Sequence, residues 1–230
     1  MIVVVDYGAA NLLSITRALE TAGAAVEVSD DPEHIRTAWA IVLPGVGAAG
    51  PAMTRMRANG VDTALRTAVA GGRPLLGICL GMQLLFERLE EDGAEGLGIL
   101  AGVSRRLRNA PKTPHIGWNS VKWDPQTLSP LAARAFATLT PGWQAYFVHS
   151  YACEPALPEQ TIAWTEYGAP ICAAVCKDRL LGVQFHPEKS GAAGVGMLRD
   201  WIVAVSADAQ SRITGSASAL VPTATPETVS

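Results

Sequence analysis

Charged residues are scarce in this chain of 230 residues. Asp, Glu, Lys and Arg make up 17% of it, whereas a typical globular domain carries about 25%. The chain has 18 basic and 21 acidic residues and a formal charge of −3, so it lacks the basic excess that binds nucleic acid. Disorder requires low hydrophobicity and high net charge, but 49% of the residues here are hydrophobic. The composition predicts a folded chain with extensive buried surface and no nucleic-acid partner.

The sequence also lacks an unbroken apolar segment of the roughly 20 residues that span a membrane. Its longest uncharged segments, 37–54 and 135–153, are interrupted by proline, glycine and polar residues. The apolar run at the start ends at Asp6 and has no basic residue before it, unlike a signal peptide. We therefore expect no membrane association and a cytoplasmic location.

Cysteine is rare as well, with only four residues, at positions 79, 153, 172 and 176. Without a secretion signal, reduced thiols are a better interpretation than disulfides. Cys172 and Cys176 have the spacing of a metal-binding pair, but no nearby residues complete a set of four ligands, so buried strand cysteines are favoured. We expect no metal and no cofactor.

The order of predicted elements indicates an α/β fold. In the first half, β-rich runs at 2–5, 26–28, 40–43 and 74–78 alternate with helical stretches at 11–21 and 61–70, which favours a parallel sheet. The second half is β-rich, with runs at about 99–107, 116–123, 143–151, 160–165, 171–176 and 180–185, a hairpin turn at 177–179 and a last helix over 193–205. We expect one domain, residues 1–206, with a mixed, largely parallel central sheet flanked by helices, and a mobile low-complexity tail, 207–230.

The segment Gly77-Ile-Cys79-Leu-Gly81 follows one of these strands and precedes a stretch, 82–89, expected to be helical. This is the cysteine form of the nucleophile elbow, in which the flanking glycines permit a sharp turn. The N-terminus of the following helix favours a thiolate, and the amide of Leu80 is available to an oxyanion. A buried structural cysteine is the alternative. We interpret Cys79 as a candidate nucleophile.

A nucleophilic cysteine needs a base, and the chain has four histidines. His186 ends an apolar run, where α/β sheets present catalytic side chains, and Glu188 can point the same way and hold the imidazole. The alternative is a strand-end histidine beside a solvated glutamate. His34 lies in a polar stretch and is expected on the surface, and no chemistry is assigned to His115 or His149.

A glycine-rich segment, Pro44-Gly-Val-Gly47, follows the predicted strand 40–43. Its backbone amides can face a developing negative charge. On its own this is a weak signal, because glycine-rich turns after strands are common.

In chain order, the strings PGVG, GICLGMQ, HSY and QFHPEKS resemble the class I glutamine amidotransferase family of the triad type. More narrowly, six segments resemble the glutaminase subunits of imidazole glycerol phosphate synthases: 6–11, 44–47, 77–86, 114–119, 146–151 and 184–190. The resemblance covers residues 1 to about 205 and implies a flavodoxin-like fold.

The resemblance implies a role for each matching residue. Cys79 would attack the side-chain amide of glutamine to form a thioester and release ammonia, His186 would transfer protons, and Glu188 would hold His186. The backbone amides of Gly47 and Leu80 would form an oxyanion hole once the 44–47 loop rearranges. The positions implied to bind glutamine are Gly45, Gln83, Glu91, Ser150 and Tyr151.

The implied partner is a (β/α)8-barrel cyclase subunit, which uses the ammonia to make imidazole glycerol phosphate and an aminoimidazole carboxamide ribotide in histidine biosynthesis. Trp118, Asn119, Tyr146 and Lys189 would be interface or gating residues, the alternative being core aromatics and a solvated lysine. A covered face also fits the scarcity of charge. Two other hypotheses stay open: a glutaminase for a different synthase or a stand-alone γ-glutamyl hydrolase, and a non-enzymatic binding module.

Overall fold

A seven-stranded sheet forms the centre of the computed structural model, which describes residues 1–8 and 10–218, with side chains as far as residue 207. The strand order is β11-β12-β13-β4-β3-β1-β2. Neighbours from β13 to β2 pair in parallel, and β12 and β11 continue the sheet in antiparallel fashion. The predicted mixed, largely parallel sheet is therefore confirmed. Its strands are β1 (Ile2–Val5), β2 (Val26–Ser29), β3 (Ala40–Leu43), β4 (Leu75–Ile78), β11 (Thr161–Glu166), β12 (Pro170–Lys177) and β13 (Leu180–Val183).

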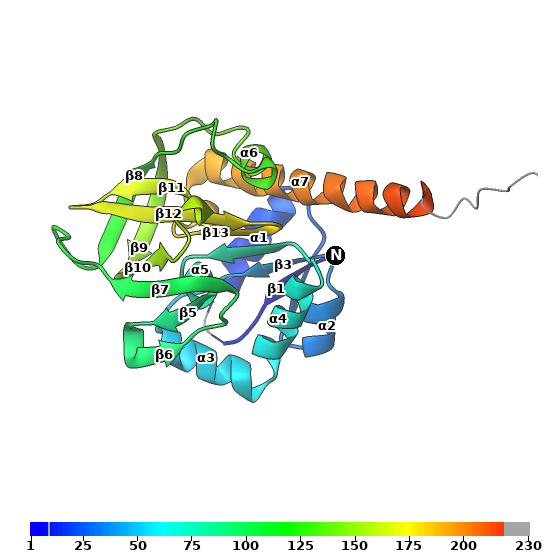
Figure 1. Ribbon diagram of the computed structural model, residues 1–230, viewed down its shortest axis with the longest axis horizontal. Coiled ribbons are helices and arrows are strands. Elements are labelled where there is room, and N and C mark those ends of the chain that lie inside the picture. The colour runs from blue at the N-terminus through cyan, green and yellow to red at the C-terminus, as the bar shows by residue number, and fades with distance from the viewer. Residues whose placement is uncertain (9, 219–230) are drawn as a thin grey trace, which may run out of the picture.

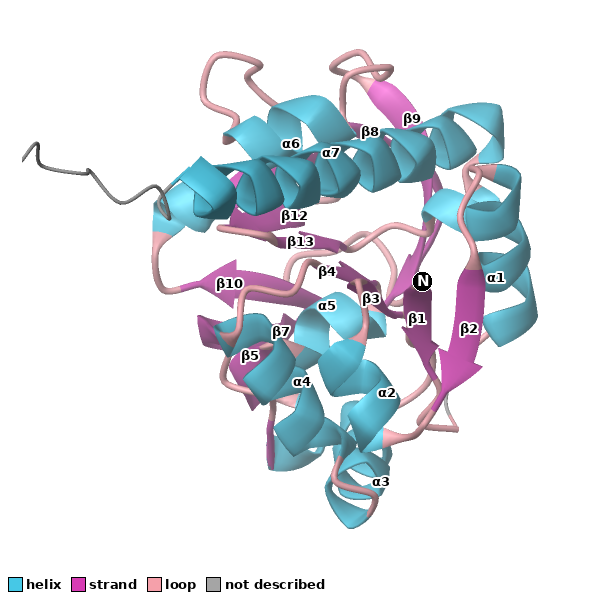
Figure 2. Cartoon of the chain, turned by 90° about the vertical axis from the view of Figure 1, so that its right-hand side faces the viewer, coloured by secondary structure: helices cyan, strands magenta, loops and turns pink. Residues whose placement is uncertain are grey.

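Helices cover both faces of this sheet (Figure 1, Figure 2). Side chains of β1 alternate between two cores, Ile2 and Val4 in one and Val3 and Val5 in the other, as expected for a strand buried on both faces. This two-sided burial accounts for part of the scarcity of charge. The first core includes α1 (Leu12–Thr21), α6 (Pro130–Ala135) and α7 (Gly191–Ser218), and the second includes α2 (Pro32–Thr37), α3 (Ala49–Ala58), α4 (Val61–Ala70) and α5 (Leu80–Leu84).

Two smaller sheets and three short 3-10 helices complete the described fold. One sheet has the order β10-β7-β5-β6, and the other is the antiparallel pair β8-β9. Both lie on the left-hand side of the domain in Figure 1, the side on which β11 and β12 of the central sheet lie. The remaining elements are β5 (Phe86–Leu89), β6 (Ala94–Glu95), β7 (Leu100–Arg106), β8 (His115–Val121), β9 (Trp143–His149), β10 (Tyr151–Pro155), η1 (Glu91–Gly93), η2 (Pro158–Gln160) and η3 (Pro187–Lys189).

Two predicted helix boundaries are wrong. The helix expected over 82–89 ends at Leu84, because the chain from Phe86 pairs with β7 instead. The last helix, expected to end at residue 205, continues to Ser218, since no proline interrupts the sequence before Pro222. Part of the expected mobile tail is thus helical, and residues 219–230 lie outside the described residues.

No helix among the described residues is long and apolar enough to cross a membrane.

Candidate active site

Cys79 lies at the turn between β4 and α5, with φ 54° and ψ −111°, a conformation that non-glycine residues rarely adopt. The neighbouring glycines make this turn possible. A Cβ at Gly77 would lie 3.1 Å from the carbonyl oxygen of Gly81, and a Cβ at Gly81 would overlap the backbone of Leu43. The structure therefore has the strand–turn–helix geometry that the sequence predicts around Cys79.

Parallel pairing brings the end of β13 beside the end of β4. Gly182 is opposite Gly77 and Val183 is opposite Ile78, so the residues that follow both strands emerge at one edge of the sheet. His186 is the third residue after the end of β13 and is the N-cap of η3. Sheet register, rather than sequence proximity, thus places a histidine next to a cysteine 107 positions away in the chain.

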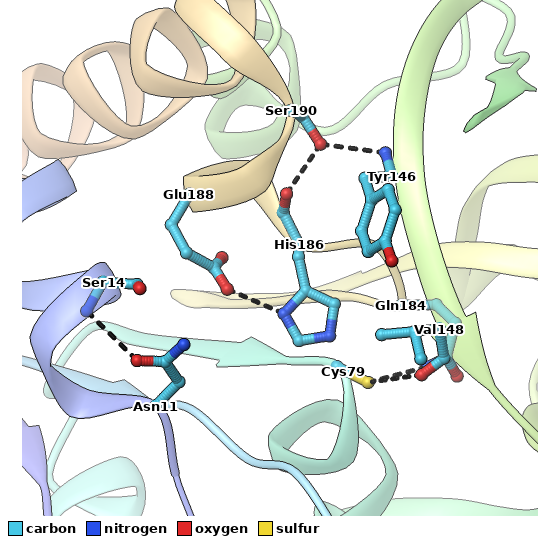
Figure 3. Close-up of polar contacts among 9 residues, drawn as sticks. All are labelled: Asn11, Ser14, Cys79, Tyr146, Val148, Gln184, His186, Glu188 and Ser190. Atoms are coloured by element: carbon cyan, nitrogen blue, oxygen red, sulfur yellow. Dashed lines mark hydrogen bonds and ion pairs between the residues drawn. The ribbon is translucent and has the colours of Figure 1, made fainter. Parts of the chain in front are cut away.

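One ring nitrogen of His186 is hydrogen-bonded to a carboxylate and the other has no hydrogen-bond partner among the described residues (Figure 3). Its Nδ1 lies 2.7 Å from Oε1 of Glu188, and both side chains are almost fully buried. Its Nε2 is buried without a hydrogen-bond partner among the described residues, and it is on the side of the ring toward Cys79 (Figure 3). Nδ1 is therefore oriented by a carboxylate while Nε2 remains available for proton transfer.

The surroundings of His186 also affect its charge. Burial alone lowers the pKa of His186, but electrostatic interactions with the nearby Cys79 and Glu188 outweigh burial and raise this pKa above its ordinary value. A protonated imidazole beside a cysteine stabilises the thiolate form. The arrangement is suited to attack by sulfur on a carbonyl carbon.

A cavity of about 380 Å³ opens in front of Cys79. It brings together most of the residues that the sequence analysis singled out for the oxyanion and for glutamine. Gly45 is the exception: it is a buried residue of the loop and does not line the cavity, and a Cβ there would lie 2.8 Å from Cβ of Leu80. The lining consists of Val46, Gly47, Cys79, Leu80, Gln83, Glu91, Pro114, Val148, His149, Ser150, Tyr151 and Lys189.

The glycine-rich loop at one side of the cavity is attached at each end by a side chain. The hydroxyl of Tyr7 donates to the carbonyl of Pro44 (2.8 Å), and the amide of Ala49 donates to Oε2 of Glu91 (2.8 Å). Burial, the largest influence, raises the pKa of Glu91. Between these attachments Gly47 has φ +91° and is exposed.

Four residues near the site were not assigned a role from the sequence: Tyr7, Gln184, His115 and His149. Gln184 is fully buried, and its Nε2 lies 3.6 Å from Sγ of Cys79. His149 lines the cavity and hydrogen bonds to His115. The strings DYG, HIGWN, HSY and QFHPE contained these residues, but nothing local indicated their partners.

Of the four residues expected at a partner interface, Lys189 lines the cavity, and the other three lie on the paired strands β8 and β9. Trp118 on β8 is 56% exposed and meets Tyr146 on β9 edge to face, with ring centroids 6.1 Å apart. Nζ of Lys189 lies 5.9 Å from the centroid of the Tyr146 ring. Asn119 is half-buried and donates to the carbonyl of Glu166 (2.9 Å).

The remaining chemistry-bearing residues have ordinary environments. His34 is exposed, as expected, and pairs with Glu27 at 2.7 Å. The four cysteines are free thiols, and Cys172 and Cys176 both lie on β12, as the strand interpretation predicts. Within the described part of the chain, no group of three or more His, Cys, Asp and Glu side chains is placed to hold a metal ion.

The sequence matches a known protein family, and named members of it, over most of its length. The family model described as glutamine amidotransferase class-I matches residues 3–205. The protein named imidazole glycerol phosphate synthase subunit HisH from Symbiobacterium thermophilum is 49% identical over 202 residues, which cover 87% of this chain and 92% of that protein. The equally named subunit from Herpetosiphon aurantiacus is 44% identical and covers 88% of this chain and 93% of that protein.

Solved structures with low sequence identity share the fold. A structure of PurLQS from Thermotoga maritima has a TM-score of 0.68 at 18% identity and covers 87% of this chain and 96% of that chain. The glutaminase domain of CTPS from Trypanosoma brucei has a TM-score of 0.62 at 16% identity, covering 89% of this chain and 93% of that chain. At these identities the likeness concerns the fold alone.

Proposed function

The chain belongs to the class-I glutamine amidotransferase family, and we propose that within this family it is the glutaminase subunit of an imidazole glycerol phosphate synthase. It hydrolyses glutamine to glutamate and ammonia and passes the ammonia to a cyclase partner in histidine biosynthesis. The observation that carries this proposal is the arrangement of His186, whose Nδ1 is bonded to Glu188 while its free Nε2 is directed toward Cys79. We also infer a cytoplasmic location, which agrees with four free thiols.

In the proposed reaction, the thiolate of Cys79 attacks the side-chain carbonyl carbon of glutamine. The carbonyl π electrons move to oxygen and give a tetrahedral oxyanion. His186 donates the proton on Nε2 to the nitrogen, the C–N bond breaks, and ammonia leaves a glutamyl thioester. His186 then takes a proton from water, which attacks the thioester, and the resulting intermediate expels the sulfur of Cys79 to give glutamate.

The oxyanion needs backbone donors. Leu80 is the first residue of α5, so its N–H has no acceptor within the helix and remains available. We assign the second donor to Gly47, in the loop attached by Tyr7 and Glu91. Gln83, Glu91, Ser150 and Tyr151 line the cavity around Cys79 and are proposed to bind glutamine.

The partner surface is proposed to surround the cavity mouth. Trp118 is 56% exposed and the nearby Ile116 is 59% exposed on the same strand, and aromatic residues are enriched in interface cores. With Asn119, Tyr146 and Lys189 this surface would contact a (β/α)8-barrel cyclase. The cavity then opens toward the partner, so ammonia need not cross bulk water.

Co-expression with the barrel cyclase from the same organism tests the proposal. The two chains should co-purify and make imidazole glycerol phosphate from glutamine. Cys79→Ala should abolish synthesis from glutamine and leave synthesis from ammonia unchanged, whereas the matched variant Cys172→Ala should behave like the parent. Unchanged glutamine-dependent synthesis by Cys79→Ala would contradict the mechanism. Full glutaminase activity of the isolated chain, without co-purification, would favour the stand-alone hydrolase instead.

A further inference from the structure

Besides His186, the sulfur of Cys79 has two polar neighbours among the described residues, and they differ in kind. The carbonyl oxygen of Val148 lies 3.7 Å away and can only accept, so it suits the thiol, whose S–H donates. Nε2 of Gln184 lies 3.6 Å away and can only donate, so it suits the thiolate. Loss of the thiol proton therefore weakens the first contact and strengthens the second.

The orientation of the Gln184 amide is determined by a second contact. Its Oε1 accepts from Nε2 of Gln83 at 3.0 Å. A flipped Gln184 amide would place two donors against each other and its own oxygen against the sulfur. Gln83 is held in turn, because its Nε2 also donates to the carbonyl of Tyr151 (2.9 Å). Each amide group in this pair therefore has one consistent orientation.

The carbonyl of Tyr151 connects this pair to two buried histidines. Nδ1 of His149 lies 2.8 Å from that oxygen and must carry the hydrogen, since a carbonyl cannot donate. Burial lowers the pKa of His149 and of His115 to about 4, so both rings are neutral near pH 7. Nε2 of His149 must then accept from Nδ1 of His115, 3.0 Å away.

The last hydrogen bond in this series connects His115 to Asn119, and both residues lie on β8. Nε2 of His115 accepts from Nδ2 of Asn119, 3.3 Å away. Asn119 is itself oriented, because its Oδ1 accepts from the amide of Ser120 (2.8 Å). The His115 ring is stacked between Phe147 and Tyr167, with centroids 4.9 and 3.8 Å away, so its nitrogens cannot easily turn from their partners.

We propose that these groups form one hydrogen-bond network, in which the Tyr151 carbonyl accepts from both Gln83 and His149, and that it positions the Cys79 nucleophile and links it to Asn119 on β8. Gln184 is the residue that contacts the reacting sulfur. Gln83, His149 and His115 are positioning residues that act through it and through the Tyr151 carbonyl. The link to a partner rests on the proposed function above, which places Asn119 at the interface.

The direct test measures the alkylation of Cys79 by iodoacetamide as a function of pH, followed by mass spectrometry of the peptide that contains it. Burial raises the pKa of the thiols of Cys153, Cys172 and Cys176, so their slower reaction is separable. Gln184→Met keeps an unbranched side chain and removes the donor. We expect the midpoint of the pH profile to rise by about one unit, because the thiolate loses a side-chain donor.

Gln160→Met is the matched control, because Gln160 is also buried but lies on η2, away from Cys79. It should leave the midpoint unchanged. If Gln184→Met does not fold, Gln83→Met should raise the midpoint by a smaller amount, since it frees Oε1 of Gln184 and lets the amide turn. An unchanged midpoint in whichever of these two variants folds overturns the role of Gln184.

His115→Phe tests the distant part of the network in the complex with the cyclase. Phenylalanine retains the stacking against Phe147 and Tyr167 and removes both ring nitrogens. We expect a several-fold rise in KM for glutamine with a smaller change in kcat, because the Tyr151 carbonyl at the cavity loses its fixed position. A lower thermal midpoint with unchanged KM would show a purely structural role and overturn this part.

The alkylation experiment uses neither glutamine nor the cyclase. A negative result there counts against the network and leaves the proposed glutaminase function intact. Conversely, a complex that makes no product from glutamine, while Gln184→Met still shifts the alkylation profile, overturns the proposed function and leaves the network standing.

Discussion

The candidate active site has two sides that are constructed differently. The side formed at the ends of β4 and β13 carries Cys79, His186 and Glu188, whose side chains are almost fully buried. The opposite side is the loop 44–48, in which Val46 is 37% exposed. We refer to them below as the strand side and the loop side.

The difference lies in what holds each side. Backbone hydrogen bonds between parallel strands hold the strand side, and they cannot shift without disrupting the sheet. The loop side is attached by two side-chain hydrogen bonds, from Tyr7 to Pro44 and from Ala49 to Glu91. The nucleophile and base are thus already assembled, while the proposed oxyanion donor at Gly47 is free to adjust.

The largest expected effect comes from a substitution on the strand side that removes a charge and leaves the size of the side chain unchanged. Glu188→Gln keeps the size of the side chain but cannot stabilise a charged imidazole, so kcat for glutamine hydrolysis in the complex should fall by about 10³–10⁴-fold. Steady-state kinetics with a coupled glutamate assay measures it. Glu159→Gln, an exposed glutamate on η2, is the control. A loss of less than tenfold would show that Glu188 does not orient His186.

The second effect compares the two glycines of the loop side. Gly45→Ala should lower the free energy of unfolding by roughly 1–3 kcal/mol, because its Cβ would lie 2.8 Å from Leu80 Cβ and 2.9 Å from the Gly81 nitrogen. Gly47→Ala has open space around it but a φ of +91°, so it should cost about 1 kcal/mol. Urea unfolding measures both. Equal losses in the free energy of unfolding would mean that the structure around Gly45 accommodates a Cβ as easily as the open surroundings of Gly47.

The third effect concerns the histidines behind the strand side. His115 and His149 have their pKa lowered by burial to about 4 when folded, against about 6.5 when unfolded. The unfolded chain therefore binds more protons between these values, and stability falls as the pH drops through this window. His186, which also faces His149, has a raised pKa, so its stabilising contribution is complete below pH 6.5 and is lost as the pH rises above that value.

Between pH 6.5 and 5.5 the loss should be about 1 kcal/mol for each histidine. Urea unfolding at both pH values, for the parent and for His149→Gln, measures the contribution. The variant should lose less stability over this window than the parent, because it has one fewer buried histidine to protonate. An identical loss would show that His149 is not kept neutral by the fold.

The smallest expected effect comes from removing one of the two hydrogen bonds that attach the loop side. Tyr7→Phe removes the donor to the Pro44 carbonyl and should cost about 1 kcal/mol of stability. Amide hydrogen exchange should become faster at residues 45–48 and stay unchanged in β4 and β13. Tyr167→Phe, on the far side of His115, serves as the control. Faster amide exchange in β4 and β13 as well would mean that loosening the loop side also destabilises the strand side.

Local sequence signals predicted the strands best where apolar side chains run without a break. The ranges 2–5 and 40–43 match β1 and β3, because strands buried on both faces need no alternation. The short helix α2 and the alanine-rich and methionine-containing α3 gave weak periodicity and were missed. β5 was mistaken for helix because its conformation depends on pairing with β7, which no local pattern shows.

The same distinction applies to the site. Cys79, His186 and Glu188 were identified because each stands in a short string whose local geometry suits its chemistry. Tyr7 and Gln184 were overlooked because their partners are distant: Tyr7 bonds to a carbonyl 37 residues away, and Gln184 bonds to a sulfur 105 residues away.

The sequence by itself determined the elements that depend on neighbouring residues. These include the turn at Cys79, which requires small residues at 77 and 81, and the pairing of His186 with a carboxylate two residues later. Only the tertiary structure decided which strand ends meet, how the loop side is attached, and how Asn119 connects to Cys79. The physical reason is that sheet register and buried hydrogen-bond partners are selected among segments far apart in the chain, where no local preference acts.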